Sequence, residues 1–297
     1  MNTTVKNLLQ LDSVSTYVGH TEIVKKATFG IKPGEIIGLI GPNGAGKTTI
    51  MKTILGLMKF TGRINVNGKP VTENNHASLA KVGALIEHPA IYPFLTGQEN
   101  LKLYAHSKDD MTRIVTRLQM NSYINSKAKG YSLGMKQKLG IAIALLNQPD
   151  LVILDEPMNG LDIESTIGVR KLIQEYASRG TAFLISSHIL SELQKVMTRV
   201  VLISNGKIIL NQSISDFETI SHQKYQVTTE NNDMAKKIFS VNQVNYTEKD
   251  QHLTIAQENI FKIQDELFKN NIHLIEMTPV EVNLEQIVID ILDKERG

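Results

Sequence analysis

The sequence predicts an α/β fold, in which helices pack against a largely parallel β-sheet. Two short apolar runs, residues 151–154 and 182–185, have the length and composition of buried parallel strands. Between them, residues 165–179 place apolar side chains at helical spacing, and Gly180 follows as a helix stop. Earlier in the chain, a glycine-rich loop joins another apolar run to a helix-like segment. Strand and helix therefore alternate along the chain, which is the pattern of an α/β domain.

The glycine-rich loop, residues 41–48, reads Gly-Pro-Asn-Gly-Ala-Gly-Lys-Thr and fits the pattern G-x-x-x-x-G-K-[ST] of a phosphate-binding loop. The apolar run 36–40 precedes it and the helix-like run 48–55 follows, which is the context that the motif requires. Its glycines let backbone N–H groups surround phosphate oxygens at a helix N-terminus. We expect Lys47 to reach the β- and γ-phosphates and Thr48 to bind Mg²⁺. A glycine turn with an unrelated lysine is the alternative, and the flanking elements disfavour it. Alone, the loop would also fit a kinase, a GTPase or a helicase.

Composition narrows the class of protein. The chain has 297 residues, enough for one large domain or for a medium domain with a small one, and 41% of them are hydrophobic. Its 32 basic and 30 acidic residues give a net charge of +2, so composition does not favour nucleic acid as a partner. The absence of cysteine excludes disulfides and thiolate metal sites.

The sequence also predicts that the chain does not cross a membrane. Residues 1–7 lack the basic and apolar segments of a signal peptide. The longest apolar stretches, such as residues 140–146, are far shorter than a membrane span. The chain by itself is therefore not expected to form a channel.

Two further regions complete the predicted organisation. Residues 62–68 alternate apolar and polar side chains between glycines, as an antiparallel strand does. After residue 215 the composition changes, and no glycine occurs between Gly206 and Gly297. There we expect a small α+β domain, residues 216–297, after a first domain of residues 1–215. Its predicted strands and helices are the strands 225–228, 252–255 and 273–277 and the helices 259–270 and 284–292.

Two carboxylates follow the buried strand 151–154. Such a strand delivers Asp155 and Glu156 to the carboxyl edge of the sheet, where ligands bind in α/β folds. Asp155 is suited to hold Mg²⁺, and Glu156 is suited to act as the general base that polarises an attacking water. The alternative is that these residues are simply an acidic strand end before a proline, with no catalytic role. The phosphate loop upstream disfavours this alternative.

Two other segments are candidates for the same chemistry. His188 follows the strand 182–185, where it could bind the γ-phosphate and orient the water, although a lone histidine there is often a solvated loop residue. Ser132 is a candidate cap for the apolar helix 139–146, and Gly134 leaves the backbone open to close approach. A serine and N–H groups at a helix start can bind an anion. The glycine-rich loop already binds all the phosphates of the chain's own nucleotide, so this second site would serve a nucleotide on another subunit. The alternative is an ordinary helix start with no ligand.

Together these segments resemble the nucleotide-binding subunit of an ATP-binding cassette (ABC) transporter over residues 8–215 or so. The matches are residues 41–48 with Walker A, 151–155 with Walker B, Glu156 with the catalytic glutamate, 132–135 with the signature, 160–162 with the D-loop, and His188 with the switch histidine. The resemblance implies the P-loop NTPase fold of ABC ATPases, with a mixed sheet core, an antiparallel β subdomain, and a helical subdomain near residues 88–148. A small C-terminal α+β appendage would follow.

The resemblance also implies site residues and partners. It assigns catalysis to Lys47, Glu156 and His188, Mg²⁺ binding to Thr48, Glu87 and Asp155, and ATP binding to Tyr17, Gly41, Pro42, Asn43, Gly44, Ala45, Gly46, Lys47, Thr48, Thr49, Ser132 and Gly134. Tyr17 stands where the family stacks an aromatic ring on adenine, although a tyrosine in an N-terminal strand can simply belong to the core. Two ATP molecules would lie between the subunits of a head-to-tail dimer, formed with a second copy or a homologous chain. The dimer would drive separate permease subunits from the cytoplasmic face of the cell membrane.

Two departures from the family pattern narrow the expected function. The signature carries Leu133 and Met135 where glycine and glutamine are common, which is similar to bacitracin, antibiotic and ABC-2 exporters. Glu87 replaces the usual Q-loop glutamine, which is similar to the E-loop of lantibiotic-immunity transporters. A carboxylate there can still coordinate Mg²⁺, and its added charge could raise the pKa of a neighbouring carboxylate and slow turnover.

These departures favour an ATPase subunit that powers export of, or immunity to, a peptide antibiotic of lantibiotic or bacitracin type. A generic ABC-2 exporter of drugs, polysaccharide or sodium ions remains an alternative. A soluble ABC protein acting on ribosomes or DNA usually carries two cassettes, whereas this chain has one phosphate loop and is not basic. A regulatory subunit that does not hydrolyse ATP would not need Glu156 and His188.

Overall fold

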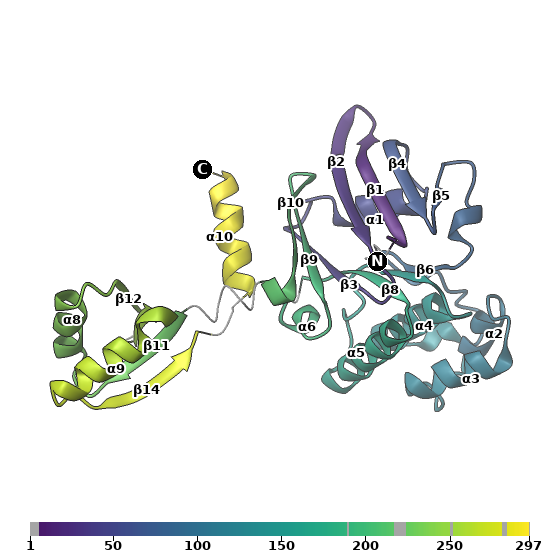
Figure 1. Ribbon diagram of the computed structural model, residues 1–297. Helices are drawn as coiled ribbons and strands as arrows, with labels where there is room; N and C mark the ends of the chain where they lie inside the picture. The colour runs from purple at the N-terminus through teal and green to yellow at the C-terminus, as the bar shows by residue number, and fades with distance from the viewer. Residues whose placement is uncertain (1–5, 189, 217–223, 250–251, 281–283, 297) are drawn as a thin grey trace, which may run out of the picture. The chain divides into compact units, whose positions relative to one another are not determined.

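A computed structural model of the chain describes residues 6–188, 190–216, 224–249, 252–280 and 284–296 (Figure 1). The chain divides into two compact units, Met1–Gln212 and Ser213–Gly297, which we call the N-terminal unit and the C-terminal unit. None of the helices in the described ranges has the length and apolar character needed to cross a bilayer.

The N-terminal unit is an α/β structure with two sheets. Its strands are β1 Leu9–Val18, β2 Thr21–Ile31, β3 Ile36–Ile40, β4 Phe60–Val66, β5 Lys69–Pro70, β6 Val82–Leu85, β7 Leu151–Leu154, β8 Ala182–Ser186, β9 Arg199–Ser204 and β10 Lys207–Ser213. Its α-helices are α1 Lys47–Ile54, α2 Gly97–Lys102, α3 Lys108–Arg117, α4 Leu133–Leu145, α5 Ile163–Ser178 and α6 Leu190–Gln194.

The central sheet has the strand order β10-β9-β3-β8-β7-β6, and β3 pairs in parallel with both β8 and β9. Strands β3, β7 and β8 are buried along their whole length, which explains their continuous apolar sequences. The second sheet, β2-β1-β4-β5, is antiparallel. The predicted mixed α/β fold is confirmed.

Helix α1 connects the two sheets. Its buried side chains, Ile50, Met51 and Ile54, belong to one apolar cluster with residues of β1, β2 and β4 and of β3, β7, β8 and β9. Burial of side chains of this size contributes about 1.5–3 kcal/mol each. Helices α2, α3 and α4 gather apart from the antiparallel sheet (Figure 1). The core therefore fixes the first turn of α1 against the carboxyl edge of the central sheet.

The predictions for single elements differ from the structure mainly at helix ends. Helix α4 begins at Leu133, well before the apolar run 139–146, because Ser132 caps it through a hydrogen bond from the Met135 N–H. The strand expected at 62–68 is β4, shifted two residues towards the N-terminus.

The C-terminal unit has its own fold and core. Its elements are β11 Lys224–Thr229, α8 Asn232–Val241, β12 Tyr246–Lys249, β13 His252–Ala256, α9 Ile260–Lys269, β14 Leu274–Pro279 and α10 Leu284–Arg296. The sheet order β12-β13-β11-β14 and the β-α-β-β-α-β succession are those of a ferredoxin-like fold. Phe239, Leu253 and Leu267 lie buried in its core. The three strands and two helices predicted here are confirmed, whereas α8 and β12 were not predicted.

Candidate functional site

The glycine-rich loop connects β3 to α1, and its conformation depends on glycine. Gly44 and Gly46 have φ angles of 77° and 106°, which L side chains rarely adopt. Gly46 is the N-cap of α1, so helix N–H groups open towards the loop. The Lys47 ammonium donates hydrogen bonds to the carbonyl oxygens of Gly41 (2.7 Å) and Pro42 (3.2 Å). The loop thus combines N–H groups, a helix dipole and a cation, as a phosphate site requires.

Asp155 lies beside the first turn of α1. It directly follows β7, and its N–H donates to the carbonyl oxygen of Leu85 at the end of neighbouring β6 (2.8 Å). The Thr48 hydroxyl donates to Asp155 Oδ2 (2.7 Å). A hydroxyl and a carboxylate held together are the oxygen ligands that Mg²⁺ prefers. The residues present therefore fit a magnesium ion shared with nucleotide phosphates.

Ser186, to which the sequence analysis gave no role, links the two carboxylates. It ends β8 and is fully buried. Its hydroxyl donates to Asp155 Oδ1 (2.5 Å) and accepts a hydrogen bond from the Glu156 N–H (3.0 Å). A local signal was present, since Ser186 lies two residues before His188. Asp155, however, is thirty-one residues away from Ser186 in the sequence, and the two residues meet only because β7 pairs with β8.

Glu156 has a strained backbone and a fixed side chain. Its φ angle is 50°, which is uncommon for a residue other than glycine and typical of functional sites. Glu156 Oε2 accepts a hydrogen bond from the backbone N–H of His188 (3.0 Å) and lies 2.7 Å from His188 Nδ1. The structure therefore brings the proposed base and the proposed switch histidine into direct contact.

A cavity of about 310 Å³ lies over the loop and the two carboxylates. Its lining contains Ile23 of β2, which was not predicted, and eight predicted residues: Asn43, Gly44, Gly46, Lys47, Thr48, Thr49, Asp155 and Glu156. Of the other predicted residues, Gly41, Pro42 and Ala45 belong to the same loop and His188 contacts Glu156, whereas Tyr17, Glu87, Ser132 and Gly134 are not part of the lining.

Tyr17 lies near the end of β1, paired with Glu22 of β2. Its side chain is 42% exposed, so it is not a core residue. It does not line the cavity, but Ile23, the residue after its strand partner, does. An exposed ring at this edge has space for a stacked base.

Glu87 lies two residues beyond β6, at the same edge of the sheet as Asp155. Its φ angle is 60°, and its carboxylate forms an ion pair with Lys52 of α1 (2.7 Å). Lys52 lies one helical turn after Thr48, so both side chains point from the same face of α1. The added negative charge at the Q-loop position is therefore paired with a cation.

Ser132 and Gly134 are placed at the start of α4, outside the cavity lining. Helix α4 reaches the site through Gln137, whose amide donates to the carbonyl oxygen of Glu156 (3.1 Å). A Cβ on Gly134 would lie 2.7 Å from the carbonyl oxygen of Gly160, so the segment 160–162 packs closely on the helix start. The last residue of that segment, Asp162, accepts a hydrogen bond from the Ser165 N–H (2.7 Å). This hydrogen bond lowers the pKa of the Asp162 carboxyl.

Comparison with known proteins gives the family. Residues 24–159 match the ABC transporter family model. The chain is 35% identical to the uncharacterized ABC transporter ATP-binding protein YdbJ of Bacillus subtilis, over 94% of this chain and 93% of that protein. It is 32% identical to the bacitracin transport ATP-binding protein BcrA of Enterococcus faecalis, over 94% of each chain.

A shorter relative and a solved structure point to the same family. The lantibiotic transport ATP-binding protein SrtF of Streptococcus pyogenes is 37% identical over 72% of this chain and 94% of its own length. The solved structure of an ATP-binding subunit of an ABC transporter is 30% identical, with a TM-score of 0.67 over 72% of this chain and 92% of that one. With the loop, the carboxylates and the fold described above, these matches show that the chain belongs to the ABC transporter ATP-binding proteins, the family of ATPase subunits of these transporters.

Proposed function

We propose that this chain is the ATP-hydrolysing subunit of an exporter that expels, or gives immunity to, a peptide antibiotic of bacitracin or lantibiotic type. The observation that carries the hydrolytic role is the meeting of the phosphate loop, Asp155 and Glu156 in one cavity, with His188 bonded to Glu156. The loop follows β3, both carboxylates follow β7, and His188 follows β8.

The arrangement supports a division of roles. Lys47 and the loop N–H groups would hold the β- and γ-phosphates, and Thr48 and Asp155 would hold Mg²⁺, with Glu87 as a further ligand. Bound Mg²⁺ would neutralise charge on the phosphate oxygens. Glu156 accepts a proton from the attacking water. His188 holds the Glu156 carboxylate in place through its backbone N–H and Nδ1, and Ser186 fixes the backbone of Glu156.

The surface near the start of α4 supports a dimer in which a second subunit completes each site. Leu133, in the signature segment, is 63% exposed, and Ile163, at the first turn of α5, is 83% exposed. Gly160 contacts Leu133, so these apolar side chains flank the segment 160–162. Exposed apolar side chains beside a helix start that can bind an anion suit a head-to-tail contact over the partner's ATP, formed with a second copy or a homologous subunit. In this proposal the dimer works on separate permease subunits at the cytoplasmic face of the membrane.

The lengths of the matches favour the bacitracin type among peptide antibiotics. A match over 94% of this chain, as with BcrA of Enterococcus faecalis, must include most of the C-terminal unit. The match to SrtF covers 94% of SrtF but only 72% of this chain, so SrtF has no length left for that unit. The alternative is a generic ABC-2 exporter of drugs, polysaccharide or sodium ions, which the uncharacterized relatives leave open.

The test is a growth-inhibition assay in a sensitive host. The chain is expressed together with its permease subunits, and inhibition by bacitracin, a nisin-class lantibiotic and an unrelated drug is measured. The control is the same pair carrying Glu156→Gln. The proposal predicts that the active pair raises the inhibitory concentration of a peptide antibiotic, bacitracin first, and that the control does not. Protection against the unrelated drug alone would support the alternative.

A further inference from the structure

Two open strand edges run side by side in the N-terminal unit. Strand β2 is at the edge of the antiparallel sheet, and β10 is at the edge of the central sheet. At one end the Lys25 N–H donates to the carbonyl oxygen of Gly206 (2.8 Å). Towards the other end the Arg199 guanidinium donates to Gly30 O (3.2 Å) and Asn211 Oδ1 (3.1 Å). The two edges are therefore held together at both ends, and no strand among the described residues pairs with them in between.

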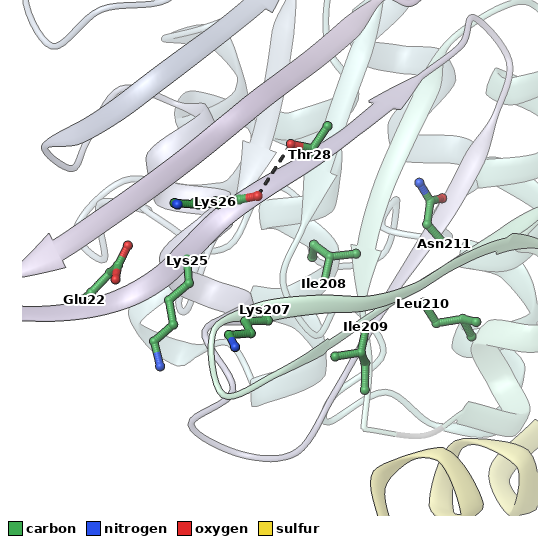
Figure 2. A pocket seen from close by; sticks show the side chains of 9 residues that line it. All are labelled: Glu22, Lys25, Lys26, Thr28, Lys207, Ile208, Ile209, Leu210 and Asn211. Carbon is green, nitrogen blue, oxygen red and sulfur yellow. Dashed lines mark hydrogen bonds between the residues drawn. The ribbon is translucent and has the colours of Figure 1, made fainter. Parts of the chain in front are cut away.

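A groove of about 680 Å³ lies between these edges (Figure 2). Three lysines, Lys25, Lys26 and Lys207, and one glutamate, Glu22, are its charged side chains, so the groove is positive. Along β10 the half-buried Ile209 and Leu210 add an apolar surface. The groove shares no residue with the cavity over the phosphate loop. It lies close to that loop, however, since the Gly206 N–H donates to the carbonyl oxygen of Ala45 (3.1 Å).

We propose that this groove binds an extended acidic peptide segment of a partner protein. An open strand edge offers unpaired N–H and C=O groups that bind an extended main chain, and neighbouring side chains select its sequence. The open stretch 26–29, between the bonded Lys25 N–H and the bonded Gly30 carbonyl oxygen, would accompany about four residues, or roughly 13 Å, of such a segment. Carboxylates on the segment would meet the three lysines.

Charge distinguishes this partner from the other candidates. A second copy of the chain would bring its own lysine-bearing edge against Lys25, Lys26 and Lys207, and like charges repel there. A small inorganic anion could meet the lysines but would leave the apolar side chains of Ile209 and Leu210 and the strand edges without partners.

The test uses the full chain and a fluorescein-labelled peptide of alternating glutamate and valine residues, long enough to fill the open stretch of roughly 13 Å. Fluorescence anisotropy at low salt should show saturable binding with a dissociation constant of about 0.1–1 mM. Added salt should weaken binding. A peptide with lysine in place of glutamate should not bind. A peptide that is N-methylated at alternate residues should also fail, because it keeps the charge but loses the main-chain donors.

The groove variant is Lys25→Glu with Lys207→Glu, and its matched control is Lys224→Glu with Lys262→Glu in the C-terminal unit. We expect the groove variant to bind the peptide at least about tenfold more weakly and the control to bind it normally. Retained ATP binding shows that the N-terminal unit, which carries the groove, is folded in each variant. The proposal is overturned if the acidic peptide does not bind, or if the N-methylated peptide binds as tightly. Equal binding to the groove variant, or full displacement by about equimolar tripolyphosphate, would also overturn it.

Discussion

Replacement of Lys52 by methionine should strengthen the response of the ATPase to Mg²⁺. Lys52 holds the Glu87 carboxylate at 2.7 Å, and the proposed function uses the same carboxylate as a metal ligand. Lys52 engages Glu87 Oε1 and therefore competes with the metal for this carboxylate. Lys47 does not compete for Glu87, because its ammonium is bonded to the carbonyl oxygens of Gly41 and Pro42.

The exposure of the ion pair sets the size of the effect. The side chains of Lys52 and Glu87 are 31% and 56% exposed, so solvent screens their attraction. Partly exposed pairs of this kind are worth about 0.2–1 kcal/mol. Release of Glu87 should therefore lower the half-saturating Mg²⁺ concentration by about 1.4- to 5-fold.

The assay is the rate of ATP hydrolysis against Mg²⁺ concentration at one fixed ATP concentration. The equilibrium between Mg²⁺ and free ATP is the same for every variant, so differences report the protein. Lys59→Met removes an equal charge just beyond α1 and measures the general electrostatic effect. Lys52→Met in a Glu87→Gln background should shift the midpoint no more than Lys59→Met does. The reasoning is refuted if Lys52→Met acts equally in both backgrounds, or if it raises the Mg²⁺ requirement.

Three other changes test separate parts of the structure. Lys47→Ala should weaken ATP binding by about 10- to 150-fold through loss of a charge-assisted hydrogen bond, and unchanged affinity in a binding titration would contradict the loop's role. Ser186→Ala should lower kcat by about 10- to 100-fold with little change in KM for ATP, because Asp155 and the Glu156 N–H lose their shared partner; a normal kcat would show that Ser186 does not position them. Phe239→Ala should destabilise the C-terminal unit by about 3–5 kcal/mol, since Phe239 is fully buried there, and hydrogen exchange of β11 and α8 would detect it. Exchange that stays slow would contradict that core.

The central sheet and the phosphate loop could be predicted because their signals are local. A parallel strand covered on both faces is a continuous apolar run, and β3, β7 and β8 are such runs. The phosphate loop has a fixed spacing of glycine, lysine and threonine within eight consecutive residues, so it can be recognised without knowledge of the fold.

Contacts between distant segments could not be predicted, since they depend on strand order. Ser186 meets Asp155 only because β8 lies beside β7, and Lys52 meets Glu87 only because α1 packs over the end of β6. The groove between β2 and β10 has the same origin, because no local pattern tells which strands remain at an edge. Helix α8 was missed because only Ala235 and Phe239 are buried among its polar residues.

The central claim is that Glu156 acts as the base in the hydrolysis of ATP, and that a second subunit completes the ATP-binding site. The most direct measurement is size-exclusion chromatography of Glu156→Gln with and without ATP and Mg²⁺, together with its ATPase rate. The account predicts that this variant binds ATP, loses hydrolysis and elutes as a dimer only when ATP is present. A variant that stays monomeric with ATP and turns over at the normal rate would contradict both the base and the shared site.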